Sequence, residues 1–291
     1  MAIHLLPRVN DALKINPPAG DNFLTVNGSN WLWTVTAIFT LSFILIAAHT
    51  HFARLHERIF HYLFAIATLV GAIAYFASAS DLGWSLILQA NSLSRGLTRQ
   101  IFFSKYIYWV VSFPVAILAL GLPAGLSWAT IAYQIFLAWT WVISWLVSAY
   151  TPTNYKWGFF AFGLAAQFLL QVSTLTTGRR SASRVGVARD YTVLAGWLNL
   201  LWLIYPIAFG LSDGGNRIGV VGGFVFFGVL DVLMIPVLAA ATLVLARNWD
   251  YSKLNIAFTQ YGRVARSEGT FPEKAPAATA PAGGVVGEHA A

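Results

Sequence analysis

The chain has 291 residues, of which 57% are hydrophobic and only 10% are charged. An ordinary soluble domain carries about 25% charged residues, so this composition excludes that class. The formal charge is +7 and there are no cysteines, which excludes disulfides and cysteine-based metal sites. Because the basic residues gather in short connecting segments, their charge indicates membrane orientation and not nucleic-acid binding.

Seven apolar blocks follow one another along the chain, and each is long enough to cross a bilayer, which requires about 20 residues per helix. They predict an all-α membrane protein built as a seven-transmembrane-helix bundle. In chain order the blocks run from Trp31 to Ala48, Ile59 to Ala77, Ile101 to Leu122, Trp128 to Tyr150, Trp157 to Leu175, Tyr191 to Leu211 and Ile218 to Ala246.

The segments between the blocks differ in charge. With seven spans, three basic clusters fall on one side of the membrane. The positive-inside rule assigns that side to the cytoplasm and places the N-terminus outside. The clusters are Arg54 and Arg58 after the first block, Arg179, Arg180, Arg184 and Arg189 after the fifth, and Arg247, Lys253, Arg263 and Arg266 after the seventh.

The remaining segments complete the expected organisation. The polar stretch "SASDLGWSLILQANSLSRGLTRQ", residues 78–100, lies on the side opposite the basic clusters and either pairs as a hairpin or follows the surface. Residues 1–28 form an extracellular segment, and residues 29–255 form the seven-helix domain. Residues 256–291 are rich in Ala, Pro and Gly and predict a largely disordered cytoplasmic tail.

Two ionisable residues stand out inside the apolar blocks. An ionisable side chain within a membrane helix costs on the order of 3 kcal/mol and normally faces the bundle interior with a partner. The blocks contain one acid near a helix centre, Asp231, and one lysine inside a span, Lys105. We therefore expect a direct or water-bridged ion pair between them. The alternative is a neutral Asp231 that hydrogen-bonds to a tyrosine.

Prolines and aromatic residues form a second pattern. Pro114, Pro206 and Pro236 lie inside blocks, where a proline kinks a helix and frees a carbonyl group. The sequences "KYIYW" and "WLIYPIAF" surround the first two prolines with aromatic rings. Alone, this pattern favours ordinary aromatic packing in a helical bundle.

Taken together, these motifs resemble the microbial rhodopsin family. The resemblance rests on Tyr106 and Trp109 in the third block, Trp202 and Tyr205 in the sixth, and Asp231 in the seventh. "WLIYPIAFGLSDGGNRIG" and "NYKWGFFAFG" are similar to its fungal branch, and the likeness extends over roughly residues 25–255. The resemblance implies a retinal pocket lined by Tyr106, Trp109, Trp202, Tyr205, Phe209, Asp231 and Ile235, with Asp231 in the counter-ion complex.

Several positions depart from the family's pattern. Ile235 stands where the family has the lysine that forms the Schiff base with retinal, and Tyr108 stands where it has the main counter-ion. Ala119 replaces the cytoplasmic proton donor of the pumps, and Gly223 replaces an acid of their proton-release group. Lys105 takes the place of an arginine. Without an amine at position 235, we expect no covalently bound retinal and no light-driven transport.

The chain then looks like the opsin-related branch that includes a 30-kDa heat-shock protein. This resemblance implies a non-photoactive, stress-associated protein of the plasma membrane. Its expected role is chaperone-like or regulatory, acting on partners such as the proton-pumping ATPase through the basic inner loops, and oligomerisation is compatible with it.

Two alternatives stay open at this point. One is a sensor that holds retinal or another apolar ligand non-covalently, and the other is a residual ion channel or transporter. An enzyme is not expected, because no nucleophile–base set or phosphate loop is present. We assign the histidines at positions 49, 51, 56 and 61 to the membrane interface and not to a metal site, so no metal is expected.

Overall fold

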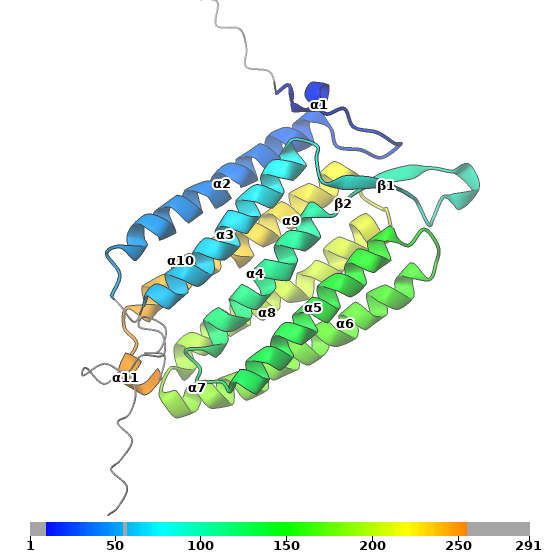
Figure 1. Cartoon of the computed structure of the whole chain (residues 1–291). Coiled ribbons are helices and arrows are strands. Elements are labelled where there is room, and N and C mark those ends of the chain that lie inside the picture. The colour runs from blue at the N-terminus through cyan, green and yellow to red at the C-terminus, as the bar shows by residue number, and fades with distance from the viewer. Residues whose placement is uncertain (1–9, 55–56, 255–291) are drawn as a thin grey trace, which may run out of the picture.

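A computed structural model of the chain describes residues 10–54 and 57–254. Within that part, seven helical rods are long and apolar enough to cross a membrane, which confirms the predicted fold class (Figure 1). The predicted tail at 256–291 lies outside the described residues. The rods are α2 (Val26–Thr50), α3 (Arg58–Ala79), α4 (Ser104–Gly121), α5 (Trp128–Tyr150), α6–η2–α7 (Lys156–Ser173, Thr174–Gly178, Arg179–Val185), α8–η3 (Ala188–Phe209, Gly210–Gly214) and α9–α10 (Val220–Met234, Pro236–Ala246).

Local sequence explains where several rods begin and bend. The side chain of Thr25 accepts a hydrogen bond from the Gly28 N–H, which caps the start of α2. Ser127 caps α5 in the same way. Pro236 has no N–H to donate, and the seventh rod accordingly breaks there into α9 and α10.

The segment between α3 and α4 folds as a hairpin, which decides between the two arrangements expected for it. Strands β1 (Trp84–Leu88) and β2 (Thr98–Phe102) pair antiparallel, with Trp84 opposite Phe102. A short helix, η1 (Leu93–Arg95), lies in the connection. The third span therefore begins at Ser104 and not at Ile101, because residues 98–102 are used by the strand.

The N-terminal segment lies at the same end of the bundle as this hairpin, together with the small helix α1 (Ala12–Ile15) (Figure 1). Asn22 forms a parallel bridge to Arg99 of β2. Its side-chain oxygen also accepts a hydrogen bond from the Val220 N–H, which starts α9. We call this end of the molecule the hairpin end. The short helix α11 (Tyr251–Leu254) lies at the opposite end.

Burial follows the membrane pattern. Aromatic and small residues fill the centre of the bundle, whereas large apolar side chains also point outward from the spanning helices, where lipid covers them. The protein is thus an integral membrane protein in contact with the bilayer. Outward-pointing examples are Leu41, Ile73, Phe136, Phe162 and Leu203.

Candidate functional site

Asp231 lies at the centre of the bundle, fully buried on α9. Tyr75 of α3 donates its hydroxyl hydrogen to Oδ2 at 2.5 Å, and Tyr205 of α8 donates to Oδ1 at 2.5 Å. The indole Nε1 of Trp109 on α4 donates to Oδ1 at 2.9 Å. All three groups donate, which is the pattern that an acceptor-only carboxylate requires. One side chain therefore connects α9 to three other helices.

The predicted ion pair between Lys105 and Asp231 is wrong in its direct form. Lys105 Nζ pairs instead with Asp213 Oδ2. The reason lies in the sixth span, which continues past the predicted end at Leu211 as the π-helical turn η3 and carries Asp213 into the bundle. The expected tyrosine contact is confirmed, because Tyr205 does bind Asp231.

Of the aromatic residues predicted to line a retinal pocket, Trp109 and Tyr205 contact each other in the core, and Trp202 packs there against two rings outside that prediction, Phe113 and Trp141. Phe113 packs against Trp141 with 4.8 Å between ring centroids and against Trp202 with 5.7 Å. Trp141 and Trp202 contact each other at 5.8 Å, and Trp109 contacts Tyr205 at 5.6 Å. These are distances of direct ring packing. Phe113, Trp141 and Trp202 thus form one contiguous cluster of rings in the core.

The remaining predicted positions lie around this core. Tyr106 is buried and donates to Asp213 at 2.9 Å, so it belongs to the charged cluster. Phe209 stacks on Trp145 at 4.7 Å. Ile235 is fully buried at the break between α9 and α10, and its N–H donates to the Asp231 carbonyl. Tyr108 packs edge-on against Phe39, Ala119 is buried in α4, and Gly223 lies beside Arg99 and Ser212.

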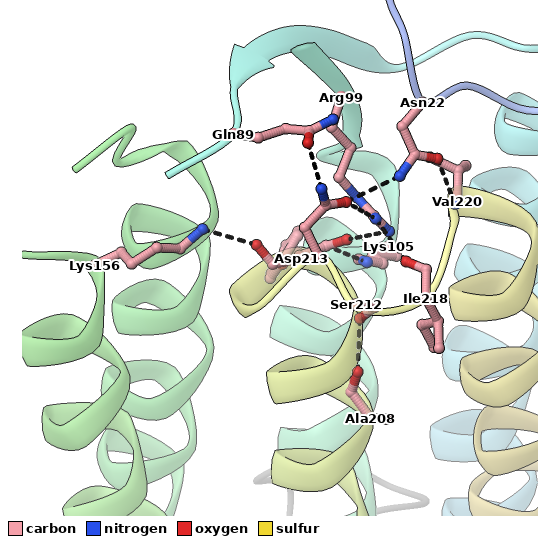
Figure 2. A network of polar contacts seen from close by, with 12 residues as sticks. Asn22, Gln89, Arg99, Lys105, Lys156, Ala208, Ser212, Asp213, Ile218 and Val220 are labelled. Atoms are coloured by element: carbon pink, nitrogen blue, oxygen red, sulfur yellow. Dashed lines mark hydrogen bonds and ion pairs between the residues drawn. The ribbon is translucent and has the colours of Figure 1, made fainter. Parts of the chain in front are cut away.

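A second polar site surrounds Asp213 at the hairpin end (Figure 2). Arg99, Lys105, Lys156 and Asp213 are each at most 7% exposed. Arg99 Nη2 lies 3.5 Å from Asp213 Oδ1, and Lys105 binds the other carboxylate oxygen. Lys156 donates to the Asp213 backbone carbonyl at 3.0 Å. In Figure 2, Lys156 approaches Asp213 from one side while Arg99 and Lys105 approach from the other.

Arg99 also ties the cluster to the surrounding loops. Its Nη1 donates to Asn216 Oδ1 at 2.7 Å and to the Ile218 carbonyl at 2.8 Å. Burial lowers the pKa of the Arg99 guanidinium, whereas the Asp213 carboxylate opposes that shift. An arginine starts from so high a pKa that it stays charged. Arg99 is therefore a buried and permanently charged cation beneath the hairpin.

Sequence reasoning missed this cluster. Arg99 and Asp213 were counted outside the apolar blocks, and Lys156 lies at the first residue of α6. The available signal was "LSDGGN", in which two consecutive glycines follow the acid. A Cβ at Gly215 would lie 2.3 Å from the Gly210 carbonyl oxygen, so the wide turn that buries Asp213 requires a glycine there.

Three histidines of the described residues, His49, His51 and His61, lie at the end opposite the hairpin. His49 Nδ1 lies 2.8 Å from His61 Nε2, and the two rings stack at 5.0 Å. His49 Nε2 contacts Arg247, whereas His51 is exposed and His56 lies outside the described residues. Within the described part of the chain, no group of three or more metal-ligating side chains is close enough to hold an ion.

The seven rods, the buried acid on the last of them and the aromatic core define a class, that of microbial-rhodopsin-type membrane proteins. The chain belongs to the bacteriorhodopsin-like protein family, whose model matches residues 27–235. It is 37% identical over 268 residues to the opsin-like protein carO of Fusarium fujikuroi, covering 88% of this chain and 87% of that protein. It is 34% identical to the 30 kDa heat shock protein of Saccharomyces cerevisiae, covering 78% and 75%.

The solved structures agree with this assignment. The light-driven proton pump LR (Mac) from Leptosphaeria maculans superimposes with a TM-score of 0.73 at 28% identity, covering 78% of this chain and 98% of that chain. The protein is thus an opsin-like integral membrane protein of the fungal type.

Proposed function

We propose that this protein is a non-photoactive opsin-related protein that acts by contacting other proteins of the plasma membrane. The observation that carries the proposal is how the aromatic core is packed and which groups bind Asp231. The rings of Phe113, Trp141 and Trp202 contact one another. Asp231, which would face a cation if it served as a counter-ion, instead accepts hydrogen bonds from neutral groups such as the Trp109 indole.

The described side chains near Asp231 also do not include the amine that covalent retinal binding requires. Covalent attachment needs an amine beside Asp231, and position 235, one turn further along, is an isoleucine. Within the described spans, the lysines are Lys105 and Lys156, and both are engaged around Asp213.

The first experiment tests the loss of photochemistry. The protein is purified with all-trans retinal, and its visible absorbance is recorded before and after borohydride reduction. We expect no retinal-dependent band. A retinal-dependent visible band that borohydride bleaches, leaving ultraviolet retinyl absorbance that stays on the denatured protein, would refute the proposal, because only a Schiff base is fixed in that way. The light-driven proton pump LR (Mac) from Leptosphaeria maculans, treated identically, is the positive control.

The second part of the proposal is a stress-associated, chaperone-like or regulatory role toward a partner such as the proton-pumping ATPase. It is supported by the likeness to a relative named as a heat shock protein. It is also supported by the exposed arginines of α7, of which Arg179, Arg180 and Arg184 offer positive charge to an acidic partner surface or to anionic lipid.

Co-reconstitution tests this role directly. The proton-pumping ATPase is placed in proteoliposomes with the protein, and ATP-driven acidification is measured. We expect a changed pumping rate that is lost in the combined variant Arg179→Gln, Arg180→Gln and Arg184→Gln. Gln replacements at Arg54 and Arg58, in another basic loop, serve as the control. Equal rates with and without the protein would contradict regulation of this pump.

One binding test distinguishes the sensor alternative from the proposed role. Ring packing in the core argues against non-covalent retinal there, and saturable binding that disappears in Trp202→Ala would reverse that conclusion. The channel or transporter alternative requires ion flux in proteoliposomes that is altered by Asp231→Asn.

A further inference from the structure

The charges around Asp213 do not balance. Among the described residues, three buried cations, Arg99, Lys105 and Lys156, surround one carboxylate. Two positive charges are thus left without a carboxylate partner. Burying an unpaired charge costs several kcal/mol, so such a centre normally acquires a counter-charge.

Neighbouring acids do not supply that counter-charge. Asp21 is held by Thr98, through the backbone N–H at 2.7 Å and the hydroxyl at 3.0 Å. Asp81 accepts hydrogen bonds from Gln100. Gly223 carries no side chain, although a Cβ there would lie only 3.6 Å from Arg99 Nη2. This position beside the guanidinium therefore adds no negative charge.

Hydrogen-bond donors are also left over in the cluster. Arg99 Nε is buried and has no hydrogen-bond partner within the described residues. The Lys156 ammonium has three hydrogens, of which one is directed to the Asp213 carbonyl. Buried donors without acceptors are rare in folded proteins, and each one calls for a water or an ion.

These donors border a small hollow. It measures about 10 Å³ and is lined by both cations and by polar side chains of the hairpin and the η3 turn. That is room for one small particle, a water or a monatomic ion, and too little for an oxyanion such as phosphate. Its charged and polar lining residues are Gln89, Arg99, Lys156, Asp213 and Asn216.

We propose that this hollow is a binding site for one chloride ion, with Arg99 and Lys156 as its cationic ligands. The anion takes the place of the missing carboxylate and accepts the unused hydrogens of both side chains. Figure 2 shows Lys156 and Arg99 reaching Asp213 from opposite sides, and both residues line the hollow beside it. This inference is independent of the partner-binding role.

The experiment compares chloride with gluconate, which is too large for the hollow. The full chain is reconstituted in uncharged lipid nanodiscs, and its thermal unfolding is followed at constant ionic strength while chloride replaces gluconate. A ligand that binds only the folded protein raises the midpoint as its concentration rises. We expect that rise in the wild type and a flat response in Lys156→Gln. Arg217→Gln, which removes an exposed cation from the same end of the molecule, should behave as the wild type.

A second measurement does not depend on any variant folding. Chlorine NMR of the wild-type protein should show excess line broadening of chloride that is removed by bromide. Superimposable unfolding curves in chloride and gluconate, together with no excess broadening, would overturn the proposal. That result would assign the hollow to a water molecule. A chloride response that persists in Lys156→Gln would equally overturn it.

Discussion

Tyr75 and Asp231 lie 156 positions apart in the chain, and the tyrosine hydroxyl donates to the carboxylate at 2.5 Å. Replacing Tyr75 with Phe should lower the free energy of unfolding by about 1.5–3 kcal/mol, the range for a hydrogen bond to a charged group. Unfolding by SDS in mixed micelles measures this loss. Tyr108→Phe is the matched control, because Tyr108 is equally buried beside Tyr75 but does not hydrogen-bond to Asp231. If the two variants lost the same free energy of unfolding, the loss could not be attributed to the hydrogen bond between Tyr75 and Asp231.

The two buried acids should respond differently to amide replacement. Asp213→Asn leaves lysines and an arginine that can only donate, so we expect a loss of about 3–5 kcal/mol, as for breaking a buried ion pair. Asp231→Asn should cost less, since a tyrosine hydroxyl can turn and accept from the new amide. The same unfolding measurement ranks the two variants. The reverse order would show that Asp231 carries the larger electrostatic role.

Asp81, between α3 and β1, predicts a pH dependence. Burial raises the pKa of its carboxyl from 3.8 to about 6, and the Gln100 hydrogen bonds only partly oppose this. The folded protein therefore holds the Asp81 proton more tightly than the unfolded chain does. This contribution to stability is fully present below about pH 4 and is lost as the pH rises to about 6.

Thermal unfolding across that pH range checks the prediction. In Asp81→Asn the corresponding change should disappear. Asparagine is the appropriate replacement because residue 81 has φ 54°, a left-handed conformation that asparagine tolerates. A variant with the same pH profile as the wild type would remove Asp81 from this role.

The ring contacts predict which substitutions would make room for retinal in the aromatic core. Ile235→Lys alone should yield no pigment with retinal, because Trp141 fills the space beside Phe113 and Trp202. Adding Trp141→Ala should create the room, at a cost of about 3–5 kcal/mol in stability. Visible absorbance with all-trans retinal compares the two. A full pigment band from Ile235→Lys alone would show that the rings separate readily.

Sequence reasoning located the centre of the bundle because its signals are local. A lone acid in an apolar helix must face inward, and the motif around Pro206 places Tyr205 on the neighbouring helix. The choice of partner for Lys105 is different, because it depends on where the sixth span ends. A π-helical turn of five residues, Gly210–Gly214, moves Asp213 from an expected loop into the core. Periodicity based on an α-helix does not register such a turn.

The hairpin illustrates the same limit. Its polar sequence indicated a surface position, and the strands do pair as one of the two expected arrangements. What the pattern does not contain is the inward direction of Arg99. That direction is set by residues more than a hundred positions later, at Asn216 and Ile218. The site around Asp213 therefore depends on contacts between segments that are far apart in the sequence.

The contacts of Asn22 fix an order of assembly. Its amide binds Asn216, and its side-chain oxygen receives the Val220 N–H, 194 and 198 positions further along. A chain is synthesised from its N-terminus, so both partners of Asn22 emerge only when the seventh span does. The backbone bridge from Asn22 to Arg99 can form as soon as the hairpin does. The two side-chain contacts of Asn22 form last, after the final helix has entered the membrane.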